Sequence, residues 1–295
     1  MESGFRTTDY ASFLCERRLL MIDSHQHFWK YSEIEYGWIS PSMGVLKRDF
    51  LPQDLDKEIG PRGFEGCVAV QARSTMEETR WLLELAAKHP FIKAVVGWVD
   101  VLSPAVDSNL QFAISHLKFK GVRHIAQDEP DERFLMRPDF LRGVKAVLDA
   151  GLSYDLLIYP NQLPLALDFA EHFSGARIVL DHLAKPFIRE KKTEPWATNI
   201  FELGSLPHVY CKVSGLVTEA AHLGWSPDDF KYYLDTVLDS FGPQRLMYGS
   251  DWPVCLLAAS YGQVFDLAKT FSERLSPEEQ KGFFGENAKK FYKIA

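Results

Sequence analysis

The stretch MIDSHQHFW at residues 21–29 begins as an apolar strand and ends in two histidines one residue apart, followed by two aromatic residues. Side chains alternate along a strand, so Asp23, His25 and His27 are expected to share one face. Two imidazoles on one face suit coordination of zinc or hydrogen bonding to one substrate oxygen. The alternative is a pair of partly exposed histidines with no role.

Seven further apolar segments have a similar build. Each is a short run rich in Val, Ile, Leu and aromatic residues, which is typical of a strand buried on both faces of a parallel sheet. With the first, the predicted strands are 20–28, 66–72, 94–100, 119–125, 152–158, 177–182, 209–215 and 245–251. Their starts lie 25 to 46 residues apart, which leaves room for a helix in each interval and exceeds the length of a hairpin turn.

Helical patterns fill several of these intervals. The clearest is MEETRWLLELAAKH at 76–89, and the patterns at 137–151 and 228–242 end at Gly151 and Gly242, which are suitable C-terminal caps. Eight strand–helix units predict an α/β fold of the (β/α)₈ TIM-barrel type, formed as a single domain by residues 21–295. A doubly wound open sheet is disfavoured because the glycine-rich turn after its first strand is missing.

The composition is that of a globular protein, with 295 residues, 46% hydrophobic and 25% charged. A net charge of -7 argues against nucleic acid or an anionic membrane as partner, and no apolar run approaches the ~18 residues of a membrane span. Four cysteines without a Cys-x-x-Cys pair predict reduced thiols and a cytoplasmic protein. Residues 1–20 are polar and irregular, and predict either a flexible extension or a segment ahead of the true start at Met21.

Polar side chains gather at the predicted strand ends, which form the active-site face of a TIM barrel. The residues are His25, His27, Gln71, Asp100, Arg123, His124, Asp155, His182, Lys212 and Asp251. A purely structural barrel has no need of a charged or imidazole group at nearly every strand end. Together these residues predict a catalytic or binding site at that face.

Individual residues suggest separate roles. Asp251 is a candidate general base, although an aspartate there could simply cap the next helix. His182 follows Asp181 at the end of an apolar strand, and such a pair could also be a structural hydrogen bond. Arg123 and His124 lie on opposite faces of their strand, so at most one of them points inward.

A substrate-binding group is also predicted. Gln71 and Lys212 stand where a buried strand would normally carry Val or Ile, and a buried polar group needs a partner in the protein or in a substrate. Arg123 and His124 are assigned to the same group. Trp38 is added because sugar rings commonly stack on tryptophan, although packing is the more usual role of such residues.

Several motifs together resemble the amidohydrolase-related family, from about Met21 to Tyr292. They are MIDSHQHFW, VVGWVD, GVRH, YDLL, LDHLAKP, KVSGLVTEA, RLMYGSDWPVC and FGENAKKFY. Within the family they are most similar to the branch of sugar-acid lactonases, such as the L-fuconolactonases and L-rhamnonolactonases. The resemblance implies a distorted (β/α)₈ barrel and hydrolysis at a carbonyl group.

The resemblance also implies a ligand set for a metal ion. It maps the family's metal and catalytic positions onto His25, His27, His182 and Asp251. Many related enzymes carry a residue that bridges two metals at strand four and a histidine at strand five, whereas these ends here are Arg123-His124 and Asp155. A two-metal site is therefore not expected, and any metal should be a single divalent ion such as zinc.

The sequence thus predicts a hydrolase that opens a sugar lactone, with a small molecule as its partner and either a monomeric or a homo-oligomeric state. Asp251 would activate water, while His25, His27 and His182 would polarise the carbonyl, directly or through one zinc ion. Three alternatives remain open: a metal-dependent amidase or deaminase, a decarboxylase of the same superfamily, and a sugar-binding barrel without catalysis.

Overall fold

The computed structural model describes residues 21–295, so the predicted N-terminal extension at 1–20, including Cys15, lies outside the described residues. Eight strands form one sheet in which every strand pairs in parallel with its neighbour in the sequence. The strands are β1 (Met21–Gln26), β2 (Phe64–Val70), β3 (Ile92–Gly97), β4 (Phe119–His124), β5 (Ser153–Leu156), β6 (Ile178–Leu180), β7 (Val209–Val213) and β8 (Leu246–Tyr248). The predicted (β/α)₈ barrel is confirmed.

The sheet closes on itself through backbone hydrogen bonds between the C-terminal end of β1 and the residues that follow β8. The Asp251 amide donates to the carbonyl oxygen of His25 at 2.8 Å, and the His27 amide donates to that of Trp252 at 2.7 Å. Residues that lie more than 200 positions apart in the sequence are thereby held side by side. The closing seam therefore places Asp251 next to the two histidines of β1.

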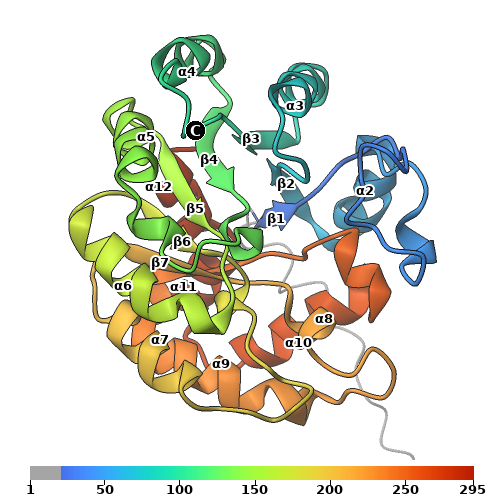
Figure 1. Cartoon of the computed structure of the whole chain (residues 1–295). Coiled ribbons are helices and arrows are strands. Elements are labelled where there is room, and N and C mark those ends of the chain that lie inside the picture. The colour runs from blue at the N-terminus through green and yellow to red at the C-terminus, as the bar shows by residue number, and fades with distance from the viewer. Residues whose placement is uncertain (1–20) are drawn as a thin grey trace, which may run out of the picture.

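The strands are accompanied by α-helices, most of which surround the barrel as an outer ring (Figure 1). They are α2 (Pro52–Ile59), α3 (Met76–Lys88), α4 (Val106–Ile114), α5 (Pro138–Asp149), α6 (Leu163–His172), α7 (Trp196–Gly204), α8 (Leu216–Glu219), α9 (Pro227–Phe241), α10 (Tyr261–Ser272), α11 (Pro277–Lys281) and α12 (Asn287–Tyr292). The helices predicted at 76–89, 137–151 and 228–242 are confirmed as α3, α5 and α9. Gly151 and Gly242, which follow two of them, have φ angles of +77° and +69°, a region that favours glycine.

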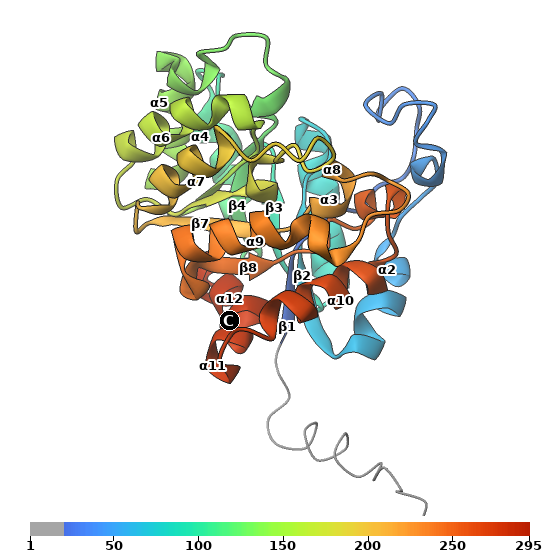
Figure 2. The same ribbon diagram turned by 90° about the horizontal axis from the view of Figure 1, so that it is seen from below.

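The apolar core has two layers. A large cluster lies between the strands and the outer helices. A smaller one fills the inside of the barrel with side chains such as Val68, Val96 and Met247, and Phe291 and Tyr292 of α12 pack against it. Figure 2 shows α12 beside β1 and β8. The C-terminal helix therefore plugs the end of the barrel that lies opposite the predicted site.

The described cysteines Cys67, Cys211 and Cys255 are buried free thiols, as predicted. Within residues 21–295, the helices are too short or too polar for any of them to cross a lipid bilayer.

Candidate active site

An irregularity in β1 decides which of its side chains enter the barrel. The pairing with β2 shifts register between Asp23 and Gln26. The Asp23 carboxylate therefore faces the helix layer, where it accepts a hydrogen bond from the Tyr261 hydroxyl of α10 at 3.1 Å. The rings of His25 and His27 remain together, with centroids 5.0 Å apart. The prediction of a shared face is therefore wrong for Asp23 and confirmed for the two histidines.

The backbone is strained where β6 and β8 end. His182 and the three residues after it have φ angles of +51° to +57°, and Asp251 has a φ of +56°. Few residues other than glycine adopt this left-handed region, and strained backbone of this kind concentrates at functional sites. At these two positions the side chains of His182 and Asp251 lie close to His25 of β1.

Three imidazoles gather around one carboxylate oxygen. The Oδ1 atom of Asp251 lies 3.3 Å from Nε2 of His27, and 3.9 Å from Nε2 of both His25 and His182. All four side chains are at most 6% exposed. The four residues that the sequence singled out as catalytic or metal-binding are therefore brought together at the predicted face of the barrel.

Hydrogen bonds on the far side of two rings set their orientation. Nδ1 of His27 lies 2.9 Å from the carbonyl oxygen of Val70, to which it must donate, and Nδ1 of His182 lies 2.8 Å from the Ser214 hydroxyl. In the neutral His27 ring, the Nε2 lone pair then faces the Asp251 carboxylate. Two acceptors this close repel each other unless a proton or a metal ion lies between them.

The charges of these groups follow from burial and from their neighbours. Burial lowers the pKa of His182 to about 4 and holds the pKa of His25 well below its ordinary value. Burial alone would raise the pKa of Asp251, but His182 and His27 together hold it below 3.8. At neutral pH the site therefore presents neutral His25 and His182 rings and an ionised Asp251.

This donor set fits a single zinc ion. Ligand atoms around tetrahedral zinc lie about 3.3 Å apart, because Zn–N and Zn–O bonds are about 2.0–2.1 Å long. His25, His27 and Asp251 offer atoms that all lie within 4.8 Å of one another, and His25, Asp181 and His182 form a second such group. Imidazole nitrogen and carboxylate oxygen are ligands that zinc commonly takes.

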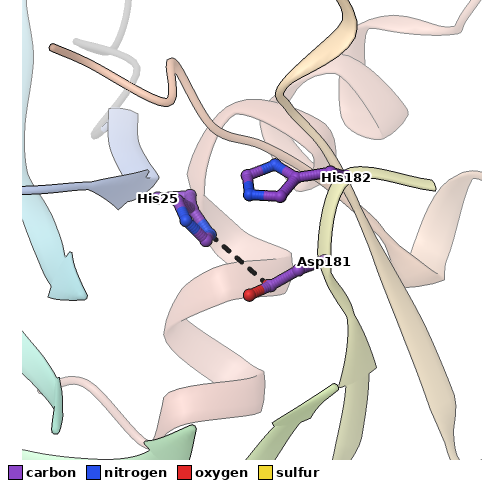
Figure 3. A group of neighbouring side chains, drawn as sticks. All are labelled: His25, Asp181 and His182. Carbon is purple, nitrogen blue, oxygen red and sulfur yellow. Dashed lines mark ion pairs between the residues drawn. The ribbon is translucent and has the colours of Figure 1, made fainter. Parts of the chain in front are cut away.

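Asp181 is a member of the site that the predicted residue set did not include. Figure 3 shows its carboxylate directed at the ring of His25, with His182 beside them. Its Oδ1 lies 3.4 Å from Nδ1 of His25, and its Oδ2 accepts from the Arg123 guanidinium at 3.1 Å. Burial opposes its ionisation, but Lys212, His25 and Arg123 hold its pKa well below 3.8. The sequence signal that could have identified Asp181 was its position at a strand end, directly before His182.

Of the neighbouring pair on β4, one residue points inward. Arg123 is 3% exposed and lies 3.3 Å from Nε2 of His25 through its Nη1 atom. His124 bonds to Glu129 at 2.6 Å and stacks on Phe134 with ring centroids 5.1 Å apart. The predicted opposition of Arg123 and His124 is confirmed, and His124 faces away from the histidine group.

The remaining predicted substrate-binding residues lie at different distances from the centre. Gln71 donates through its amide to the carbonyl oxygen of Arg123 at 3.2 Å, and its buried Oε1 has no hydrogen-bond partner. Lys212 is fully buried beneath His25. Trp38 is 41% exposed and packs edge to face on Trp29, and within residues 21–295 none of its ring contacts reaches the histidine group.

A closed parallel barrel with histidines and an aspartate at the ends of β1, β6 and β8 is a TIM barrel whose polar site lies at the face that TIM-barrel enzymes use for catalysis. The chain belongs to the amidohydrolase family, whose sequence pattern matches residues 22–294.

Relatives of known name and structure cover nearly the whole chain. An L-fucono-1,5-lactonase from Burkholderia multivorans is 43% identical over 286 residues, which is 93% of this chain and 96% of that protein. A crystal structure of a Burkholderia multivorans amidohydrolase with bound HEPES has a TM-score of 0.89 at 42% identity, covering 94% of this chain and 100% of that one. A second such structure, with bound zinc, has a TM-score of 0.88 at 43% identity over the same shares of the two chains.

Proposed function

We propose that the protein is a hydrolase that opens a sugar-acid lactone, such as L-fucono-1,5-lactone, to the free acid. The observation that carries this proposal is that three imidazole Nε2 atoms surround Oδ1 of Asp251. The similarity of the chain to an L-fucono-1,5-lactonase supports it. The curated relatives favour neither an amidase nor a decarboxylase. A binding protein would have no use for an ionised base in the centre of its site.

Asp251 is assigned as the general base. Its ionised carboxylate takes a proton from water as the water oxygen bonds to the lactone carbonyl carbon, which leaves an oxyanion on the former carbonyl oxygen. As the carbonyl re-forms, the bond from that carbon to the ring oxygen breaks, and the ring oxygen receives the proton from Asp251. One water is consumed, and the product is an open hydroxy acid.

One zinc ion would be held by His25, His27 and Asp251, with His182 beside them. Such an ion would relieve the repulsion between the Nε2 lone pair of His27 and the Asp251 carboxylate, whose atoms lie 3.3 Å apart. Such an ion would supply Lewis-acid polarisation of the carbonyl oxygen. The Arg123 guanidinium, 3.3 Å from Nε2 of His25, adds a fixed positive charge that stabilises the developing oxyanion.

Sugar hydroxyls would be bound around this centre. The buried Oε1 of Gln71 is an acceptor without a partner, which a substrate hydroxyl can satisfy. His124 and Trp38 lie farther out and are assigned to the rim of the site. We also assign residues 21–295 to one domain and the reaction to carbohydrate metabolism in the cytoplasm, where the buried thiols would stay reduced.

The proposed activity is tested with a panel of five- and six-carbon aldonolactones, followed by a pH indicator in weak buffer. We expect acid release well above the spontaneous rate for at least one lactone, with kcat/KM in the range of roughly 10⁴–10⁸ M⁻¹s⁻¹ that is typical of natural substrates. Amide analogues and aromatic acids serve as the comparison. Efficient amide hydrolysis or release of carbon dioxide, without lactone opening, would overturn the proposal.

A further inference from the structure

A chain of buried groups runs beneath the site, inside the barrel. The Lys212 ammonium lies 2.5 Å from Oδ2 of Asp155, 3.0 Å from Oδ1 of Asp181 and 3.1 Å from Nδ1 of His25. All four side chains are fully buried. Because these groups are shielded from bulk solvent, each is held mainly by its contacts with the others.

The chain continues to the C-terminal helix. The hydroxyl of Tyr292, the last residue of α12, donates to Oδ2 of Asp155 at 2.6 Å. The Lys212 ammonium lies 5.5 Å from the centroid of the Tyr292 ring. Tyr292 thus contacts both members of the Lys212–Asp155 pair, from the end of the barrel opposite the site.

The ring of His25 is held between two cations. Its Nδ1 atom lies 3.1 Å from the Lys212 ammonium and 3.4 Å from Oδ1 of Asp181, and its Nε2 atom lies 3.3 Å from the Arg123 guanidinium. Lys212 also lies 3.0 Å from Oδ1 of Asp181. The position of Lys212 therefore sets the contacts on the Nδ1 side of the ring.

We propose that Tyr292, Asp155 and Lys212 are positioning residues that act on the Nδ1 side of His25 to keep its ring, and with it the Nε2 atom, directed at the reaction centre. The C-terminal helix is thereby a support for the catalytic histidine as well as a plug for the barrel. A partner that orients a catalytic or metal-binding histidine typically affects activity about 10–100-fold, and more distant partners affect it less. The effect on turnover rests on the proposed lactonase function.

The inference is tested with Tyr292→Phe, which removes the hydroxyl and keeps the ring. We expect kcat for the lactone to fall by roughly 3- to 10-fold while KM changes less than about twofold, because the ring of His25 is less well oriented. In ¹⁵N NMR spectra of the metal-free protein, the ring nitrogen signals of His25 should shift from their wild-type positions, because the contact between Nδ1 and Lys212 is less well fixed. The signals are assigned by their loss in His25→Gln.

Tyr154→Phe is the matched control, because Tyr154 is equally buried on β5 but packs against Phe140 and Phe169 on the helix side. Its kcat and the ring nitrogen signals of His25 should match the wild type. Unchanged kcat and unchanged His25 ring signals in Tyr292→Phe, or equal losses in both variants, would overturn the positioning role. If the wild type opens no lactone, the proposed function fails, and the NMR comparison alone decides this inference.

Discussion

Replacing Asp251 with asparagine is expected to lower kcat for lactone opening by roughly 10²-fold or more, which is the usual contribution of a general base. The amide keeps the size of the carboxylate but cannot take the proton from water. Asparagine also tolerates the left-handed backbone at this position, where φ is +56°, so the fold should remain intact. The loss should fall on kcat more than on KM, because proton transfer belongs to the transition state. Steady-state kinetics and a melting curve measure both effects.

Asp100→Asn is the control for an aspartate that only stabilises a turn. Asp100 follows β3, and its carboxylate accepts hydrogen bonds from the Leu102 and Ser103 amides at 3.1 and 3.2 Å. This variant should keep kcat within about twofold and lose about 1 kcal/mol of stability at most, as for other capping residues. If Asp251→Asn behaves like Asp100→Asn, Asp251 is not the base.

Replacing Lys212 with methionine is expected to lower the free energy of unfolding by about 3–5 kcal/mol. Methionine preserves the length of the side chain but leaves Asp155 and Asp181 buried without their shared cation, which lies 2.5 and 3.0 Å from them. Removing one partner of a buried ion pair is costly because the remaining charge stays desolvated. Urea denaturation followed by circular dichroism measures the change.

Lys231→Met provides the comparison at the surface. Lys231 pairs with Asp235 at 2.7 Å, but its side chain is 65% exposed, and its removal leaves Asp235 partly exposed and still paired with Arg274. Exposed pairs contribute about 0–1 kcal/mol, so this variant should unfold almost as the wild type does. Equal denaturation midpoints for the two variants would mean that the interior network contributes no more than a surface pair.

The fold was predictable because its signals are local. Each buried strand is a short apolar run, and α3 is marked by acidic residues in its first turn and by Thr75, whose side chain accepts from the Glu78 amide. The catalytic candidates were predictable for a related reason. In a parallel barrel all C-terminal strand ends meet at one face, so His25, His182 and Asp251 had to lie near one another once the strands were identified.

The rest of the site depends on contacts between distant segments. The face of Asp23 is set by a register shift against β2, which the residues of β1 alone do not encode. Lys212 was recognisable as a buried polar residue in need of a partner. Its partner Asp155 lies 57 residues away, and Asp155 is held in turn by Tyr292, 137 residues farther on. A residue in the terminal helix gives no sequence signal that it reaches the barrel interior.

The central claim, that Asp251 activates water for attack on the lactone carbonyl, is tested most directly by a single turnover in ¹⁸O-labelled water with enzyme in excess over lactone. Mass spectrometry then locates the label in the product and in the peptide that carries Asp251. The predicted result is one ¹⁸O atom in the carboxylate of the product and none in Asp251. Label in the Asp251 side chain, with an unlabelled product, would show that the aspartate attacks the substrate itself and would contradict its assignment as a base.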